Sequence, residues 1–204
     1  MGYAWKDSLG WHTTHPYPGP WIDGTSLKLD KHDYPHIGYA VYIDDYTSLV
    51  MYSYWDGNNW HTEVIDTMGR CYPRTVTLIL DSNERPHLAY GRSDEPLRHA
   101  EYINGTWHIE VVDSSGCICP FLAIDKSGHL CIAYMGKYAV KEDTNWHIET
   151  IEPYRGGRNS LYFDRENNPH ISYEGQGWLK YAWKCNGVWH IEKIDSIIPR
   201  GVLK

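Results

Sequence analysis

The 204-residue sequence predicts an all-β fold, a five-bladed β-propeller, and three observations support this. A Trp-His pair occurs five times at intervals of 49, 47, 39 and 43 residues, close to the length of one four-stranded blade. A second motif recurs in fixed register between the pairs. No stretch of ten residues has the 3.6-residue periodicity of a helix. The pairs are Trp11-His12, Trp60-His61, Trp107-His108, Trp146-His147 and Trp189-His190.

The first two strands of each unit are marked by an Asp and, six residues later, by a His or Cys. We expect the Asp to cap the turn that follows the first strand. The His or Cys begins the second strand, often as Pro-His-Ile-x-Tyr, and we interpret it as structural. The position two residues later is always small, which lets a neighbouring sheet approach closely. These positions are Asp30, His36 and Gly38; Asp81, His87 and Ala89; Asp125, Cys131 and Ala133; Asp164, His170 and Ser172.

The third and fourth strands are joined by turns such as Asn104-Gly105 and Asn186-Gly187, a strong hairpin signal. The fourth strand starts at the Trp-His pair. Three residues after the Trp, four of the five pairs carry a Glu, which we expect to lie exposed on the outer edge, where charge discourages aggregation. These residues are Glu63, Glu110, Glu149 and Glu192.

The repeats divide a single domain, residues 1–204, into blades of about 40–49 residues with four strands each. The fifth blade is expected to be shared between the two chain ends and to lack about 17 residues, including one whole strand. Three readings stay open: a three-stranded fifth blade, a gap filled by another chain, and a fragment of a longer ring. We favour a closed monomer over an oligomer that completes the fifth blade. The expected segments are 1–17 (fifth blade), 21–66, 67–113, 114–152, 153–195 and 196–204 (fifth blade again).

Composition excludes several functions. The net charge is −7 and no run of Lys and Arg exceeds two residues, which argues against nucleic-acid binding. The sequence contains no stretch of 18 apolar residues, so it predicts no membrane-spanning helix. The start of the chain has no signal-peptide pattern, so we expect a cytoplasmic protein unless the chain is a fragment of a secreted one. The odd number of Cys residues, five, favours reduced thiols over disulfides.

The unit from Ser160-Leu161-Tyr162-Phe163-Asp164 to Asp195 resembles uncharacterised bacterial and archaeal propeller repeats that are grouped with sialidase-like propellers. The chain lacks the Ser-x-Asp-x-Gly-x-Thr-Trp box of those proteins. In length and blade number it is similar to the tachylectin-type five-bladed lectins, whose sugar sites lie between blades. The resemblance implies a propeller fold and a binding function.

Function is expected where the repeats differ, in the long connections from one blade to the next. Arg74, Arg158 and Arg200 stand near the starts of first strands, and if they converge they would hold a carboxylate, a phosphate or a sugar acid. Pairing with the acids Asp113 and Asp195 is an equal alternative. Cys117, Cys119 and Cys71 lack the spacing of a usual zinc site, so no metal or cofactor is expected. The candidate ligand-binding residues are Tyr17, Trp21, Arg70, Tyr72, Arg74, Cys119, Tyr154, Arg155, Arg158 and Arg200.

We expect a ligand-binding propeller, lectin-like, that recognises a glycan or a small acidic sugar through Trp and Tyr faces. The first alternative is a glycoside hydrolase or polysaccharide lyase acting on an acidic sugar, with Tyr72 or Tyr154 in proton transfer or attack. No catalytic motif was identified, so we favour binding over catalysis. The second alternative is a protein-interaction scaffold that uses the incomplete blade as a socket for a partner's strand.

Overall fold

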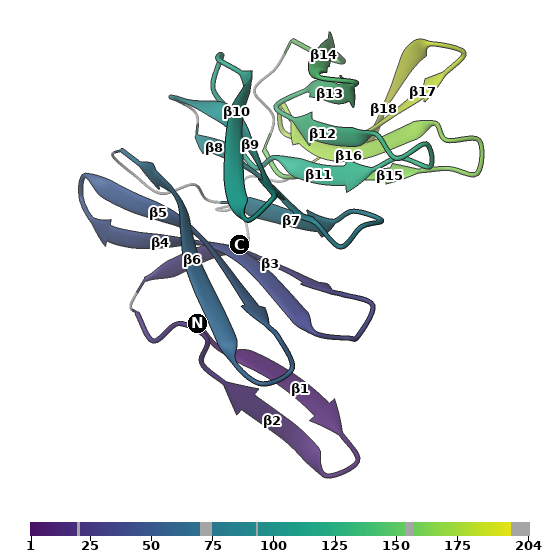
Figure 1. The fold of residues 1–204 in the computed structure, drawn as a ribbon. Helices are drawn as coiled ribbons and strands as arrows, with labels where there is room; N and C mark the ends of the chain where they lie inside the picture. The colour runs from purple at the N-terminus through teal and green to yellow at the C-terminus, as the bar shows by residue number, and fades with distance from the viewer. Residues whose placement is uncertain (20, 70–74, 93, 154–156, 197–204) are drawn as a thin grey trace, which may run out of the picture. The chain divides into compact units, whose positions relative to one another are not determined.

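The computed structural model describes residues 1–19, 21–69, 75–92, 94–153 and 157–196 (Figure 1). These residues form four four-stranded sheets and one two-stranded hairpin, and in each sheet the strands lie side by side in chain order. The all-β prediction with four strands per complete unit is therefore confirmed. The described residues contain no helix that is long and apolar enough to span a membrane.

The hairpin and the first two sheets follow the order of the repeats. The hairpin consists of β1 (Tyr3–Asp7) and β2 (Gly10–Thr14). The first sheet contains β3 (Ile22–Leu29), β4 (Pro35–Asp44), β5 (Thr47–Trp55) and β6 (Trp60–Met68). The second contains β7 (Val76–Leu80), β8 (Pro86–Arg92), β9 (Glu95–Ile103) and β10 (Thr106–Asp113).

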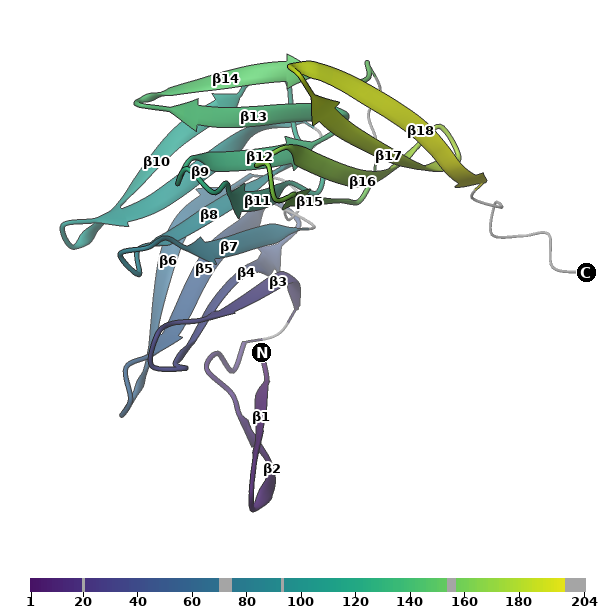
Figure 2. The ribbon, with the colours of Figure 1, turned by 90° about the vertical axis from the view of Figure 1, so that its right-hand side faces the viewer.

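The third and fourth sheets appear with their strands in chain order in Figure 2. The third contains β11 (Phe121–Ile124), β12 (Leu130–Tyr134), β13 (Lys137–Glu142) and β14 (Asn145–Thr150). The fourth contains β15 (Asn159–Phe163), β16 (Pro169–Gly175), β17 (Trp178–Cys185) and β18 (Val188–Ser196). Strand β18 includes Ser196, where we expected the fifth blade to resume, and residues 197–204 lie outside the described part of the chain.

The chain forms two compact units, one of Met1–Leu88 and Ala100–His108, the other of Ala89–His99 and Ile109–Lys204. In the first unit, buried Ile37, Tyr39, Val41 and Met51 form a core on one face of the neighbouring strands β4 and β5. The second unit has its own core, which includes Cys131, Ala133, Tyr138, Leu161, Phe163, Ile171, Tyr173 and Ala182.

The Asp at the end of each first strand caps the following turn, as predicted. Oδ1 of Asp30 accepts the backbone N–H groups of His32 and Tyr34, each at 2.8 Å. Asp81 and Asp125 accept the two equivalent N–H groups of their own turns. Each carboxylate thus satisfies backbone donors that the tight turn leaves without carbonyl partners.

The repeated His or Cys of the second strand is structural, as interpreted from the sequence. Buried His36 bonds through Nδ1 to the hydroxyl of Tyr52 on β5. His170 makes the same contact with Tyr181 on β17. Where Cys131 replaces the His, the hydroxyl of Tyr138 donates to its Sγ at 3.0 Å. A polar group at this position links the second strand to the third inside the core.

The small residue after this position allows the close approach of sheets that we predicted. A Cβ added to Gly38 would lie 3.1 Å from Cδ2 of Leu88 on β8 and 3.4 Å from Cγ1 of Val76 on β7. The backbone of β4 therefore packs directly against side chains of the second sheet, because no side chain intervenes.

Candidate functional site

One contact between neighbouring sheets is repeated three times. The Trp near the start of a fourth strand donates its indole Nε1–H to the Glu on the fourth strand of the preceding sheet. These Trp–Glu contacts are Trp107 to Glu63 at 2.8 Å, Trp146 to Glu110 at 2.9 Å and Trp189 to Glu149 at 2.7 Å. We expected these Glu residues to be exposed edge charges, and for these three that expectation is wrong, because the indole N–H of the next sheet reaches them.

A Lys completes two of these contacts. Nζ of Lys141 lies 2.7 Å from Oε1 of Glu110, and Nζ of Lys184 lies 2.5 Å from Oε1 of Glu149. Each Lys stands directly opposite the Trp in the strand register. Burial raises the pKa of Glu110, but hydrogen bonds from His99, Lys141 and Trp146 outweigh it and bring the pKa to about 2. The carboxylate is therefore ionised at neutral pH.

The junction between the β1–β2 hairpin and the first sheet keeps the aromatic part of this contact, an edge-on pair of a Tyr and a Trp. Tyr3 meets Trp60 edge-on, with ring centroids 5.6 Å apart and planes at 69°. Tyr52 and Trp107 meet in the same way at the next junction, at 5.2 Å and 73°. The aromatic contact between neighbouring sheets is therefore preserved at the hairpin.

The polar part of the contact is missing there. Thr14 lies opposite Tyr3, in the register that Glu63 occupies opposite Tyr52. Trp55 lies opposite Trp60, where a Lys stands in the third and fourth sheets. A short hydroxyl thus replaces the Glu, and a ring replaces the Lys. Among the described residues, nothing accepts a hydrogen bond from the indole N–H of Trp60.

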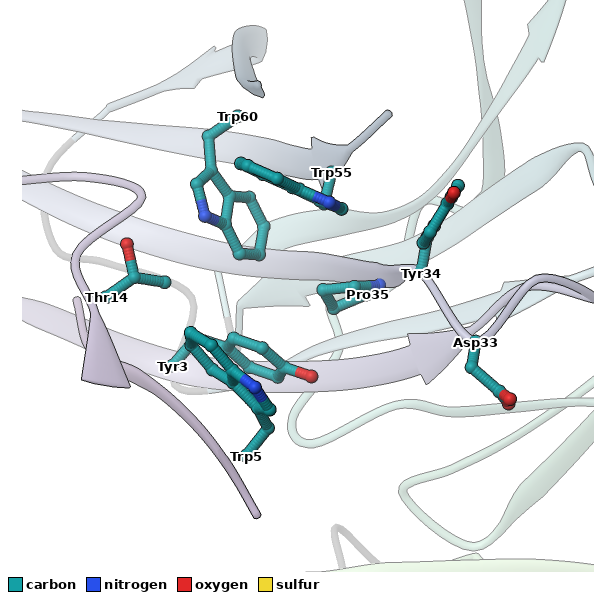
Figure 3. Close-up of a pocket in the computed structure, with 8 residues that line it drawn as sticks. All are labelled: Tyr3, Trp5, Thr14, Asp33, Tyr34, Pro35, Trp55 and Trp60. Atoms are coloured by element: carbon teal, nitrogen blue, oxygen red, sulfur yellow. The ribbon is translucent and has the colours of Figure 1, made fainter. Parts of the chain in front are cut away.

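This substitution leaves an open pocket of ≈ 300 Å³, which we call the aromatic pocket (Figure 3). In Figure 3, Trp55 and Trp60 lie on one side, Tyr3 and Trp5 on the other, and Thr14 and Tyr34 at opposite ends. The pocket is lined by Tyr3, Trp5, Thr14, Asp33, Tyr34, Pro35, Trp55 and Trp60. Mostly aromatic walls with a few polar groups are typical of small-ligand sites, and the volume is at the lower end of their range.

The rings of the pocket are held by one another. Tyr3 stacks on Trp5 with centroids 5.7 Å apart and planes at 16°. Trp55 and Trp60 lie 5.8 Å apart at 59°. Partial burial raises the pKa of Tyr3, so its hydroxyl keeps its proton and can donate a hydrogen bond. The walls are thus formed in advance of any ligand, which reduces the entropy lost on binding.

Among the described residues that line the pocket, Asp33 alone is charged. It occupies a left-handed turn position, with φ of 62°. At the same position in later turns, Glu84 and Asn167 accept the backbone N–H groups of Lys31 and Lys126 from the preceding sheet, at 3.2 Å and 2.7 Å. Asp33 has no such donor among the described residues. Its carboxylate and the indole N–H of Trp60 therefore remain available to a ligand.

The sequence singled out ten residues, and the four of them that the structure describes lie elsewhere. The ring centroids of Tyr17 and Tyr39 lie 5.9 Å apart, and the carbonyl of Cys119 accepts a hydrogen bond from the side-chain amide of Asn159. Trp21 is 77% exposed, and the side chain of Arg158 is exposed as well. None of these four lines the aromatic pocket. Arg70, Tyr72, Arg74, Tyr154, Arg155 and Arg200 lie outside the described residues, so the convergence of the Arg side chains stays a prediction.

Of the two acids proposed as alternative partners for those Arg residues, Asp113 is already engaged. Oδ2 of Asp113 accepts from Nζ of Lys137 at 2.7 Å and from the hydroxyl of Tyr134 at 2.8 Å. In the part of the chain that is described, no three His, Cys, Asp or Glu side chains are placed to share a metal ion.

The sequence itself carries a signal for the aromatic pocket. Four Trp-His pairs are followed by Glu at a fixed offset, and the first pair is followed by Thr14. The exception marks the site because the Glu fills the equivalent space at the other junctions.

No protein-family model and no curated protein matches the sequence. Solved structures do match. A fucose-binding lectin from Aleuria aurantia, described as a six-bladed β-propeller, is 13% identical, with a TM-score of 0.62 over 98% of this chain and 79% of the lectin. A Dyadobacter fermentans protein of unknown function is 10% identical, with a TM-score of 0.61 over 85% of this chain and 69% of that one.

A Trypanosoma rangeli sialidase is 11% identical, with a TM-score of 0.52 over 92% of this chain and 40% of the sialidase. At these identities the likeness establishes the fold alone. The chain is built of propeller-type sheets, similar to those of propeller lectins and sialidases, as the repeats predicted.

Proposed function

We propose that the protein is a lectin-like carbohydrate-binding propeller and that the aromatic pocket is its sugar site. The replacement of a Glu and a Lys by Thr14 and Trp55 carries this proposal, because it turns a closed contact between sheets into an open, aromatic-walled pocket. The apolar C–H face of a sugar ring packs well against such walls, while its hydroxyl groups need hydrogen-bond partners. The indole N–H of Trp60, the carboxylate of Asp33 and the hydroxyl of Tyr34 are suitable partners.

The structural neighbours support this choice of ligand class. Two of the matching structures are of a lectin from Aleuria aurantia, one described by its fucose recognition and the other in complex with a methyl fucoside. They belong to the same fold at 12% and 13% identity, so they favour a carbohydrate without specifying which one.

The experiment rebuilds the missing polar contact. The double variant Thr14→Glu with Trp55→Lys restores the Glu, Lys and Trp set seen around Glu149, so the pocket should close and sugar binding should be lost. Trp60→Phe keeps the ring but removes the N–H, and should weaken binding by about tenfold, the value of one hydrogen bond left unmade. Binding is measured on a glycan array and then by titration calorimetry.

Tyr102→Lys is the matched control, because it adds a Lys beside the Glu63–Trp107 contact and leaves the aromatic pocket unchanged. The ring of Tyr102 lies 5.3 Å from that of Trp107. The control should bind sugar like the wild type. The proposal fails if the wild type binds no glycan, or if the folded double variant binds as tightly as the wild type.

A further inference from the structure

The charge around the aromatic pocket is negative. The described residues of its lining include the carboxylate of Asp33 and no Lys, Arg or His. The chain as a whole carries a net charge of −7. An anionic ligand would meet a carboxylate with no compensating cation in the lining, whereas a cationic ligand would find both an acid and several aromatic faces.

Elsewhere in the molecule the protein places its own ammonium group at the equivalent point. Nζ of Lys141 lies 5.9 Å from the centre of the Trp146 ring, and Nζ of Lys184 lies 6.0 Å from that of Trp189. Both ammonium groups are paired with a Glu carboxylate as well. The fold thus already uses an ammonium group between a Trp ring and an acid at this register.

At the hairpin junction that ammonium group is missing. Trp55 stands in the Lys register opposite Trp60, and the aromatic rings of Tyr3, Trp5 and Trp60 remain around the space. The pocket has an acid of its own, Asp33, on the turn before β4 and at the end of the pocket away from Thr14 (Figure 3).

We infer that the sugar bound by the aromatic pocket is an amino sugar, whose ammonium group packs against the aromatic rings at the end of the pocket that holds Asp33. This inference rests on the proposed function, since it names the class of sugar for the same site. The ring of the sugar lies against the aromatic walls, and the ammonium group is attracted both to the π faces and to the carboxylate.

The test compares four matched methyl glycosides in the gluco and galacto series: the 2-amino sugar, its N-acetyl form, the neutral hexoside and the uronide. The amino sugar should bind about 3- to 10-fold tighter than the neutral hexoside, and the uronide more weakly than either. Affinities are measured by titration calorimetry at low and at moderate salt. The preference should shrink as salt rises, because Asp33 is exposed and its charge is screened.

Asp33→Asn should reduce the preference for the amino sugar and leave binding of the neutral hexoside within about twofold. Asn tolerates the left-handed turn conformation as Asp does, so folding is preserved. The matched control is Asp143→Asn, since Asp143 also occupies a left-handed turn position, with φ of 53°, and does not line the pocket. The control should keep the full preference.

The outcomes separate the two proposals. If neutral sugars bind and the amino sugar binds no tighter, or if Asp33→Asn keeps the preference, the inference is overturned and the sugar site stands. If no sugar in any series binds, both proposals fail.

Discussion

Replacing Glu110 by Gln should show how strongly a Trp–Glu contact holds two sheets together. Glu110 accepts from His99 at 2.8 Å, from Lys141 at 2.7 Å and from Trp146 at 2.9 Å. Gln keeps an oxygen that can accept one of these bonds but loses the negative charge, so the ion pair between Glu110 and Lys141 is lost.

The magnitude follows from the pKa of Glu110. Its fall from an ordinary value of 4.5 to about 2 corresponds to about 3 kcal/mol of stabilisation at neutral pH. The side chain of Glu110 is 34% exposed, and solvent screening reduces the expected loss to about 1–2 kcal/mol. Because the folded-state pKa is lowered, the stabilisation is complete above the unfolded value and is lost as the pH falls through about 2.

The assay is urea unfolding of the wild type and of Glu110→Gln at pH 7 and pH 3. The difference in the free energy of unfolding should be about 1–2 kcal/mol at pH 7 and less than roughly half of that at pH 3. Glu192→Gln is the control, since Glu192 stands at the same register opposite Tyr181 and has no hydrogen bond or ion pair among the described residues. Equal losses for the two variants, or a loss at Glu110 that does not change with pH, would refute the reasoning.

Two further predictions concern the core. Gly38→Val should destabilise the protein by about 1–3 kcal/mol, because the new side chain would collide with Leu88 and Val76. Ala133→Gly should lower the free energy of unfolding by about 1 kcal/mol. Thermal unfolding that ranks the two variants in the opposite order would contradict this account. Burial lowers the pKa of His36 and outweighs the raising effect of Asp30, so NMR titration should find His36 mainly neutral at pH 6.5. As the pH falls below that value, His36 should favour unfolding, because the unfolded chain takes up the proton more readily. A His36 that titrates at or above pH 6.5 would disprove this.

The repeat made most of the fold predictable. Register positions recur because each has the same structural role in every sheet. Asp30 caps a turn, His36 links two strands, and Gly38 allows a neighbouring sheet to approach. A sequence read by itself shows such positions clearly, since their partners lie within the same unit or the next. The number of blades in the closed ring stays a prediction.

The candidate site was harder to predict because it depends on what one junction lacks. Thr14 and Trp55 are unremarkable residues in a strand, and they matter only when compared with Glu149 and Lys184 at the same register. Variation between the repeats points instead to the connecting loops, where Trp21 and Arg158 lie exposed. A search for the single exception within each repeated position would have reached the pocket.

The Trp–Glu contact has a consequence for how such a protein changes over evolutionary time. Each contact joins a sheet only to its neighbour, as Trp146 joins Glu110 and Trp189 joins Glu149, so the stability of the chain is close to a sum of independent junctions. Losing one Glu then weakens one junction and leaves the others intact. A repeat protein of this kind can explore new ligands one junction at a time, at a stability cost that the remaining junctions can bear.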